Sequence, residues 1–265
     1  MPVHDDLGIR MKENYESIFK YKVTKRTPVI IRIDGKAFHT FTRGFEKPFD
    51  RNLIATMQKT MKYLCENIQG CVLGYTQSDE ISLLLVDYKK FNTQSWFDYE
   101  VQKMCSIASS MATMIFNKEF TRMANNYIDN TMEAWNISDN EKKYMSILEK
   151  AMAMGAMFDS RVFNIPKEEV TNYFYWRQLD ATRNSIEMVG QANFSHKELH
   201  KKSCNDIQEM LHEQKNINWN DFTTTEKRGS CCIKTEDGWG IDYNIPIFKG
   251  EGRDYIDNLV YCGEE

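Results

Sequence analysis

The sequence is poor in the features that mark several common classes of protein. Its 265 residues include only five prolines and 13 glycines, which argues against a collagen-like or low-complexity chain. No apolar run approaches the roughly 20 residues that a membrane-spanning helix requires. The N-terminus, MPVHDDLGIRMKEN, is too polar for a signal peptide. We therefore expect a folded cytoplasmic protein that does not insert into a membrane.

Paired cysteines and an excess of positive charge are also missing. The seven cysteines form an odd set without a C-x-x-C pair, which favours reduced thiols over a disulfide framework or a zinc ribbon. Lys and Arg total 34 against 38 Asp and Glu, so the formal net charge is −4. Any binding of nucleic acid therefore has to use a local basic patch.

The sequence does contain β-branched runs that alternate with amphipathic segments. TPVIIRIDGKAF predicts a buried strand that ends at Asp34-Gly35, and apolar spacings of three and four predict a helix over 50–68, capped by Asp50. CVLGYTQ and ISLLLVD predict two strands joined by the link Ser78-Asp79-Glu80. Further along, the pattern predicts a helix over 99–120, a polar excursion over 124–155 with one helix near 139–153, and a strand in AMFDSRVFNIP.

This order of elements predicts the α+β class. Strand, helix, strand, strand, helix, strand is the split βαβ arrangement of a ferredoxin-like fold. We assign a palm core to about 25–166. The C-terminal region, about 167–265, is predicted to contain helical stretches at 168–189 and 195–214 and a small β-rich piece made of RGSCCIKT, the turn EDGWG and IPIFKG. No long linker separates these parts, so residues 1–265 are expected to form a single catalytic unit.

Two aspartates stand at the ends of the predicted central strands, so the fold brings Asp34 and Asp79 to one edge of the sheet. Neighbouring carboxylates repel each other, and a shared proton or bound cations relieve the repulsion. Two Mg²⁺ ions about 3.5–4 Å apart can clamp the attacking and leaving oxygens of phosphoryl transfer. The carbonyl of Gly35 can add a ligand, and the backbone N–H groups of GKAFHTF, with Lys36 and Lys47, can line a triphosphate. Asp-Gly and Ser-Asp-Glu are equally ordinary turn sequences.

Other candidate residues lie in the C-terminal region. His196 and His200 have a spacing that can bind zinc, although no third ligand is evident. The lysines of the same segment are typical of a solvated helix face or of contacts with RNA phosphates. The aromatic residues of YFYWRQ suit a core or a stack with bases, and Arg177 beside Trp176 is the stronger functional candidate there.

Six short segments occur in the following order along the chain: RIDGKAFHTF, KPFD, GYTQSDEIS, FDSRVFNIP, YWRQLDATRNS and KRGSCCIK. They cover most of residues 28–234, and together they resemble the motifs of the tRNA-His guanylyltransferase family of 3′-to-5′ nucleotide-adding enzymes. The resemblance implies a polymerase-like palm with two Mg²⁺ ions, ATP and GTP or another nucleoside triphosphate as substrates, and a tRNA whose 5′ end is extended. It also implies a homotetramer.

The resemblance assigns roles to individual residues. Catalytic roles fall on Asp34, Asp79 and Glu80, with metal held by Asp34, Gly35 and Asp79. Nucleotide or phosphate contacts fall on Lys36, Ala37, Phe38, His39, Lys47 and Ser78, with Lys36 and Ala37 acting mainly through backbone atoms. We expect tRNA contacts at Arg177, Arg183, Asn184, Lys197, Lys201 and Lys202.

One departure from the family pattern concerns specificity. Eukaryotic members that modify tRNA-His carry W-R-Q-x-D-x-H-I-N-N, whereas this chain ends the motif with Thr182-Arg183-Asn184-Ser185. That ending resembles the guanylyltransferase-like branch, whose members are associated with templated repair of 5′-truncated tRNAs. ATP or GTP would activate the 5′-monophosphate, and the 3′-hydroxyl of an incoming nucleotide would then attack the activated end.

Three alternatives to templated repair remain. Dedicated addition of G to tRNA-His is the first. The second is a nucleotide cyclase, which also uses a ferredoxin-like palm with two aspartates. That activity would not account for the WRQLD segment or for the lysine-rich segment at 197–202. A non-catalytic RNA-binding protein would be favoured by loss of either aspartate, and both are present.

Overall fold

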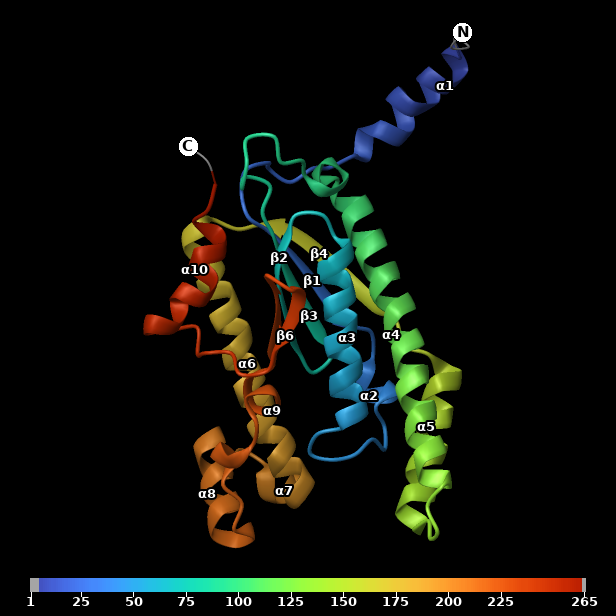
Figure 1. The fold of residues 1–265 in the computed structure, drawn as a ribbon, viewed down its shortest axis with the longest axis vertical. Coiled ribbons are helices and arrows are strands. Elements are labelled where there is room, and N and C mark those ends of the chain that lie inside the picture. The colour runs from blue at the N-terminus through green and yellow to red at the C-terminus, as the bar shows by residue number, and fades with distance from the viewer. Residues whose placement is uncertain (1–4, 264–265) are drawn as a thin grey trace.

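A twisted antiparallel sheet forms the centre of the computed structural model, which describes residues 5–263 (Figure 1). The strand order is β4-β1-β3-β2-β5-β6. The strands are β1 (Val29–Gly35), β2 (Cys71–Gln77), β3 (Glu80–Leu85), β4 (Phe158–Asn164), β5 (Ser230–Thr235) and β6 (Gly238–Asp242). The order β4-β1-β3-β2 is that of a ferredoxin-like fold, which confirms the predicted palm.

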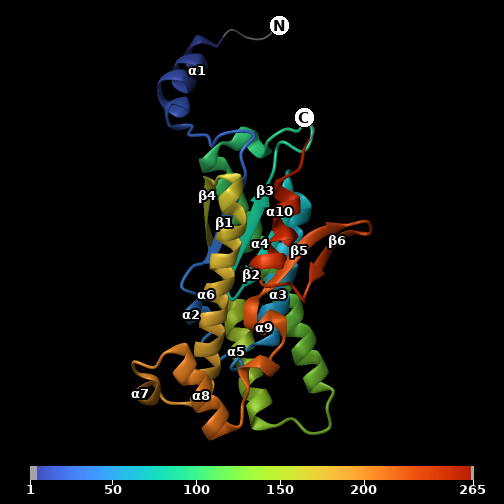
Figure 2. The ribbon, with the colours of Figure 1, turned by 90° about the vertical axis from the view of Figure 1, so that its left-hand side faces the viewer.

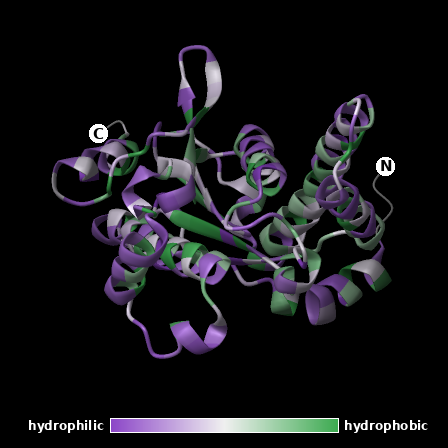
Figure 3. Cartoon of the chain, turned by 90° about the horizontal axis from the view of Figure 1, so that it is seen from below, coloured by the Kyte–Doolittle hydropathy of each residue, from purple (hydrophilic) through white to green (hydrophobic). Residues whose placement is uncertain are grey.

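Helices cover both faces of the sheet, on either side of it in Figure 1. Helices α3 (Arg51–Asn67) and α4 (Val101–Met132) cover one face, and α6 (Lys167–Asn193) and α10 (Asp254–Val260) cover the other. Because successive side chains of a strand point to opposite faces, Ile31 packs in the core beneath α3 and α4, whereas Ile30 packs beneath α6. Figure 3 shows hydrophobic residues along a central strand of the sheet, between the helices.

The first half of the palm agrees closely with the elements predicted from the sequence. Helix α3 begins after Asp50, whose Oδ1 accepts a hydrogen bond of 2.9 Å from the backbone N–H of Leu53. That contact is an N-cap, as predicted. Between β1 and α3 lies the single-turn helix α2 (Phe38–Phe41).

The long helix α4 extends farther than its sequence pattern indicated. It continues through the residues that we expected to form a polar excursion and ends at Met132, before α5 (Asp139–Met154). The extension is held by packing, because Ala124 is buried and the ring of Tyr127 lies 5.0 Å from that of Tyr144 on α5. The helix predicted near 139–153 is confirmed as α5.

The basic stretch predicted as one helix over 195–214 is broken in two. Helix α7 (His196–Leu199) is separated from α8 (Cys204–Lys215) by a turn in which Lys201 adopts a φ of 60°. Ser203 restarts the helix, since its side chain accepts from the N–H of Asp206 at 3.2 Å. The 3₁₀ helix η4 (Trp219–Asp221) and α9 (Thr224–Arg228) follow, and all four lie near the C-terminal half of α6 (Figure 2).

The C-terminal β-rich piece is part of the palm sheet. Strand β5 pairs with β2, and β6 continues the sheet beyond it. The segment IPIFKG is not a strand, and η5 (Gly250–Arg253) and α10 follow it. Two hydrogen bonds with Gln178 tie it to α6, one from the N–H of Phe248 at 3.0 Å and one to the carbonyl of Pro246 at 2.9 Å.

The N-terminal arm projects from the body in both ribbon views (Figures 1 and 2). It consists of α1 (Asp6–Met11), the π-helical η1 (Lys12–Glu16) and the 3₁₀ helix η2 (Ser17–Phe19), and none of its residues is buried. The short helix η3 (Trp96–Tyr99) precedes α4. Within residues 5–263, no helix has the length and hydrophobicity needed to cross a bilayer.

Candidate active site

A cavity of about 550 Å³ opens where β1 and the β2–β3 hairpin end. Helix α2, the segment that leads into α3, and the C-terminal end of α6 enclose it. The cavity brings together eight of the residues predicted from sequence, namely Asp34, Gly35, Ala37, Phe38, His39, Lys47, Ser78 and Asp79. Glu80 and Lys36 are not in its lining.

Asp34 lies near the end of β1, and Asp79 lies in the turn that leads into the adjacent strand β3. The backbone N–H of Gly35 donates to the carbonyl of Asp79 at 3.1 Å, so the end of β1 is tied to the hairpin. The hairpin link is shorter than predicted: Glu80 already belongs to β3, and only Ser78 and Asp79 form the turn. Ser78 adopts a φ of 51°, the left-handed conformation that tight turns use.

The electrostatics at Asp79 suit a cation. Burial, with a smaller effect from the neighbouring carboxylate of Asp34, raises the pKa of Asp79 above its ordinary value. Within residues 5–263 no group of three His, Cys, Asp or Glu side chains is placed to hold a metal ion. An ion at the cavity would therefore rely on two carboxylates and backbone oxygen. Such a donor set fits Mg²⁺, which retains water or phosphate ligands, better than it fits zinc.

Gly35 is required by its close approach to Phe38. A Cβ at Gly35 would lie 2.2 Å from Cδ2 of the Phe38 ring. That ring packs in the core against Phe41, Phe116 and Phe158, with centroid distances of 5.2, 5.5 and 5.2 Å. Phe38 thus supports the floor of the cavity from below. Lys36 does not line the cavity, and its backbone N–H donates to the carbonyl of Met157 at 2.8 Å.

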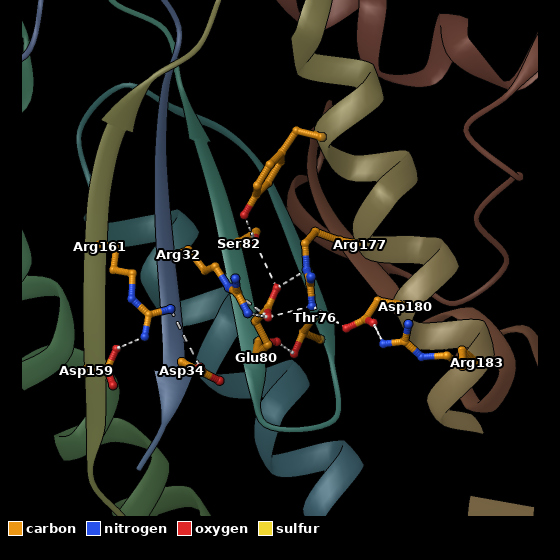
Figure 4. Close-up of polar contacts among 11 residues, drawn as sticks. Arg32, Asp34, Thr76, Glu80, Ser82, Asp159, Arg161, Arg177, Asp180 and Arg183 are labelled. Carbon is orange, nitrogen blue, oxygen red and sulfur yellow. Dashed lines mark hydrogen bonds and ion pairs between the residues drawn. The ribbon is translucent and has the colours of Figure 1, made fainter. Parts of the chain in front are cut away.

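Glu80, to which the resemblance assigned a catalytic role, is paired with arginines of the protein itself (Figure 4). The residue is only 7% exposed, and its carboxylate lies between two guanidinium groups. Arg32 binds Oε2 through Nε at 2.9 Å and Nη2 at 2.6 Å. Arg177 binds Oε1 through Nε at 2.7 Å and Oε2 through Nη2 at 2.9 Å. Both carboxylate oxygens are therefore occupied within the protein.

The ion pairs continue from Glu80 along α6. Arg177, which is 5% exposed, also binds Asp180 at 2.8 Å, and Asp180 pairs with the exposed Arg183 (Figure 4). The ring of Trp176 lies 4.4 Å from the Arg177 guanidinium. Burial lowers the pKa of Arg177, but the attraction of Glu80 and Asp180 outweighs it and raises that pKa. This placement is at odds with the expected tRNA contact at Arg177, because its donors face inward.

Two arginines near the site, Arg32 and Arg161, were not predicted from the sequence. Arg161 on β4 is the register partner of Arg32, and its Nη1 lies 3.9 Å from Oδ2 of Asp34. It is half exposed and also pairs with Asp159 at 3.4 Å. The available signal was strand alternation, since Arg32 stands two residues before Asp34 and shares its face.

The remaining predicted tRNA residues lie at the surface around the C-terminal half of α6. Arg183 and Asn184 belong to α6, Lys197 to α7, and Lys201 and Lys202 to the turn before α8. The three lysines are exposed and form no ion pair within the described chain.

Two residues of the specificity departure have internal partners. The hydroxyl of Thr182 donates to the carbonyl of Gln178 at 3.0 Å, within α6. Ser185 accepts a hydrogen bond of 3.0 Å from Nε1 of the buried Trp219, which ties η4 to α6. The two hydroxyls therefore help to hold this region together.

Comparisons with known proteins identify the family. The family model for tRNA-His guanylyltransferase matches residues 9–166. A bacterial tRNA-His guanylyltransferase-like protein solved in complex with ATP shares 44% identity, with a TM-score of 0.82 over 97% of this chain and 100% of that one. The corresponding complex with GTP shares 39% identity, with a TM-score of 0.77 over the same proportions.

Two curated proteins are also similar to this chain. The tRNA-His guanylyltransferase of Debaryomyces hansenii is 26% identical over 80% of this chain and 75% of its own length. An uncharacterised protein of Acanthamoeba polyphaga mimivirus is 29% identical over 86% of this chain and 76% of its own length. The chain belongs to the tRNA-His guanylyltransferase family of nucleotidyltransferases.

Proposed function

We propose that this protein repairs 5′-truncated tRNAs by adding nucleotides in the 3′-to-5′ direction, with the opposite strand of the acceptor stem as template. The observation that carries the proposal is the convergence of Asp34, Asp79, Ser78, Lys47 and His39 on one cavity. The solved bacterial relatives in complex with ATP and GTP support nucleoside triphosphates as substrates.

The carboxylates of Asp34 and Asp79 and the carbonyl of Gly35 would hold two Mg²⁺ ions. When bound, the ions supply positive charge that offsets the negative charge developing on the phosphate oxygens. Lys47 and Ser78 line the same cavity and are placed to bind phosphate. His39 is exposed at the start of α2, where it can orient the nucleotide. Phe38 acts through its backbone and its packing, because its ring is buried.

The reaction consists of two phosphoryl transfers. An oxygen of the tRNA 5′-monophosphate attacks the α-phosphorus of ATP or GTP, and pyrophosphate leaves. The 3′-hydroxyl of the incoming nucleotide then attacks the phosphorus of the tRNA end, loses its proton to solvent, and expels AMP or GMP. Holding both reactants in one cavity supplies the alignment that each displacement needs.

We favour repair over dedicated addition of G to tRNA-His because of the departure at residues 182–185. Thr182 and Ser185 stand where the eukaryotic motif has His and Asn, and both have hydrogen-bond partners within the protein. Base pairing with the template would then select the nucleotide. Dedicated guanylylation of tRNA-His remains the second candidate, and the match to the tRNA-His guanylyltransferase family favours it.

The proposal also covers the tRNA contacts, the extent of the catalytic unit, the oligomeric state and the cellular location. We infer that tRNA contacts come from Arg183, Asn184, Lys197, Lys201 and Lys202, and that the palm and the C-terminal region act as one catalytic unit because they share a sheet. The exposed apolar side chains of the N-terminal arm, such as Phe19 at 77%, suit burial in a homotetramer. Seven unpaired cysteines fit the reducing cytoplasm.

The test is a 5′-extension assay with Mg²⁺, ATP, all four nucleoside triphosphates and labelled tRNAs that lack their first nucleotide. Matched tRNAs share one acceptor stem and carry either a His or a non-His anticodon. Repair predicts equal extension of both. Extension of the His tRNA alone would favour dedicated guanylylation. Cyclic nucleotide without extension would make the protein a cyclase, and RNA binding without either product would make it a binding protein.

A further inference from the structure

Three cysteines from separate parts of the chain meet between α3 and the sheet. Cys65 lies in the last turn of α3, Cys71 is the first residue of β2, and Cys232 lies on β5. All three pack in or against the hydrophobic core beneath α3 and α4. None of them lines the active-site cavity, so a role for these thiols is independent of the proposed function.

A glycine makes room for the Cys65 thiol beside Cys232. A Cβ at Gly74 of β2 would lie 2.5 Å from Sγ of Cys65, so the sulfur occupies the space that a side chain would need. Gly74 is the register partner of Cys232. Paired residues of neighbouring strands point to the same face, with their Cβ atoms about 4.5–5.5 Å apart. The sulfur of Cys65 therefore lies over this strand pair, beside Cys232.

A β-bulge turns Cys71 toward the same face of the sheet. The pairing of β2 with β3 shifts its register between Cys71 and Leu73, and both Val72 and Leu73 pack beneath α6. Residues three apart in a regular strand point to opposite faces, yet Cys71 packs on the α3 side, where Cys65 contacts Gly74. The bulge and the missing side chain of Gly74 thus bring the three thiols together.

The three thiols differ in exposure and in acidity. Cys71 is half-buried and can meet a small oxidant, whereas Cys65 and Cys232 are 2% and 0% exposed. Burial, with smaller effects from hydrogen bonds to Cys232 and Cys71, raises the pKa of the Cys65 thiol. The hydrogen bond with Cys65 lowers the pKa of Cys232 below its ordinary value. Cys65 therefore retains its proton more firmly, and Cys232 is placed to accept it.

We propose that this cluster is a modification site for hydroperoxides, at which oxidation of Cys71 is completed by a disulfide with Cys65. The Cys71 thiolate attacks one oxygen of hydrogen peroxide, the O–O bond breaks, and a sulfenic acid and hydroxide form. The sulfur of Cys65 then attacks the sulfur of the sulfenic acid, its proton passes to Cys232, and hydroxide leaves. The two sulfurs lose two electrons, which the peroxide gains. Two molecules of a thiol reductant restore both cysteines by exchange.

The disulfide protects the core beneath α3. A sulfenic acid without a neighbouring thiol proceeds to a sulfinic acid, which thiols do not reduce. A sulfinate at Cys71 would place a negative charge against the apolar cluster, and burying an unpaired charge is costly. Closure by Cys65 limits the oxidation to an uncharged and reversible bond.

Peptide mapping tests the site. The full chain is treated with a small excess of hydrogen peroxide, the remaining thiols are alkylated, and a non-reducing digest is analysed by mass spectrometry. We expect a Cys65–Cys71 disulfide that dithiothreitol removes. Cys204 offers a matched control, because it is also half-buried but its charged neighbours are Glu187 and Arg183. Cys204→Ser should form the disulfide as the wild type does.

Further variants separate the roles of the three thiols. Cys65→Ala should form no disulfide and should accumulate sulfenic acid at Cys71, which dimedone labels. Cys232→Ala should form the same disulfide at least about tenfold more slowly, because the proton acceptor is lost. Thermal unfolding verifies that each variant is folded.

Three results would overturn the proposal. They are a disulfide between Cys65 and Cys232 in place of Cys65–Cys71, a link between two chains through Cys71, and dimedone labelling of Cys204 in preference to Cys71. An unchanged rate of closure in Cys232→Ala would contradict the transfer of the Cys65 proton to Cys232.

Discussion

Asp79 and Glu80 are neighbours in the chain, yet they lie in two regions of opposite electrostatic character. Asp79 lies in the hairpin turn and reaches the active-site cavity, where Asp34 is its charged neighbour. Glu80 is the first residue of β3 and lies beneath α6, where Arg32 and Arg177 bind both of its oxygens. The pairing of β2 with β3 therefore leaves the Asp79 carboxylate without an ion pair among residues 5–263, whereas the Glu80 carboxylate is bound by two arginines.

The different surroundings of Asp79 and Glu80 indicate how the fold supports a cation site. The aspartate region has charges that repel, so folding without metal has to tolerate them. The Glu80 region joins β1, β3 and α6 through charge-assisted hydrogen bonds, which anchor the hairpin beside the repelling pair. We therefore propose that Asp34 and Asp79 take part in the reaction and that Glu80 positions the hairpin.

The largest expected effect is the loss of activity in Asp34→Asn and Asp79→Asn. Bound metal ions contribute several kcal/mol to phosphoryl transfer, so we expect a decrease of about a thousandfold or more in single-turnover extension, without recovery at high Mg²⁺. The exposed Asp139 on α5 offers a charge-matched control, and Asp139→Asn should extend tRNA normally.

Asp79→Asn should also unfold at the same or a higher temperature than the wild type in EDTA at pH 7. Its raised pKa means that the folded state disfavours the charged carboxylate, so the carboxylate costs stability above that pKa and the cost disappears as the pH falls below it. Asn removes the cost. A marked loss of stability in EDTA would show that Asp79 has a structural role instead.

Glu80→Gln should show the reverse pattern, with a larger effect on stability and a smaller one on activity. The change leaves Arg177 buried without its main counter-charge, which typically costs about 3–5 kcal/mol. Activity should fall about 10–100-fold, as for residues that orient metal ligands, and higher Mg²⁺ should restore part of it. A stable Glu80→Gln protein as inactive as Asp79→Asn would place Glu80 in the reaction itself.

A double-mutant cycle between Glu80→Gln and Arg177→Met sharpens the comparison. The two residues are in direct contact, so we expect their effects on the free energy of unfolding to be non-additive by about 1–3 kcal/mol. A second cycle, between Asp180→Asn and Arg183→Ala, tests the exposed end of the same network and should give about 0–1 kcal/mol. Equal coupling at both ends would contradict the importance that we give to burial.

The smallest expected effect is that of Arg183→Ala on tRNA binding. Arg183 is 59% exposed, so its removal should leave stability nearly unchanged. If it contacts one phosphate, the log–log dependence of affinity on salt should become shallower by about 0.7–0.9. An unchanged slope would limit Arg183 to its ion pair with Asp180.

The palm could be predicted from the sequence because its signals are local. β-branched runs, the cap at Asp50 and the helical spacing after it each determine an element within a few residues. The last 12 residues of α4 depend instead on contacts with α5, such as that of Tyr127 with Tyr144. Their polar composition gave no helical signal in the sequence. The pairing of β5 with β2 joins segments more than 150 residues apart, so no local pattern indicates it.

The candidate site was predicted unevenly for a similar reason. Motifs placed Asp34, Gly35 and Asp79 together, because strand ends can be read from sequence. The motifs did not distinguish the surroundings of Asp79 from those of Glu80, because the identity of an acidic residue does not reveal which charges will surround it. The partners of Glu80 lie 48 and 97 residues away, and only the folded chain brings them together.

The most direct test of the proposed function is the choice of nucleotide opposite a changed template. Two truncated tRNAs that differ only at the templating base, C or U, are incubated with the protein, Mg²⁺, ATP and competing nucleotides. Templated repair predicts G opposite C and A opposite U, whatever the anticodon, because pairing geometry in the closed site supplies the discrimination. Continued addition of G opposite U would contradict templated repair.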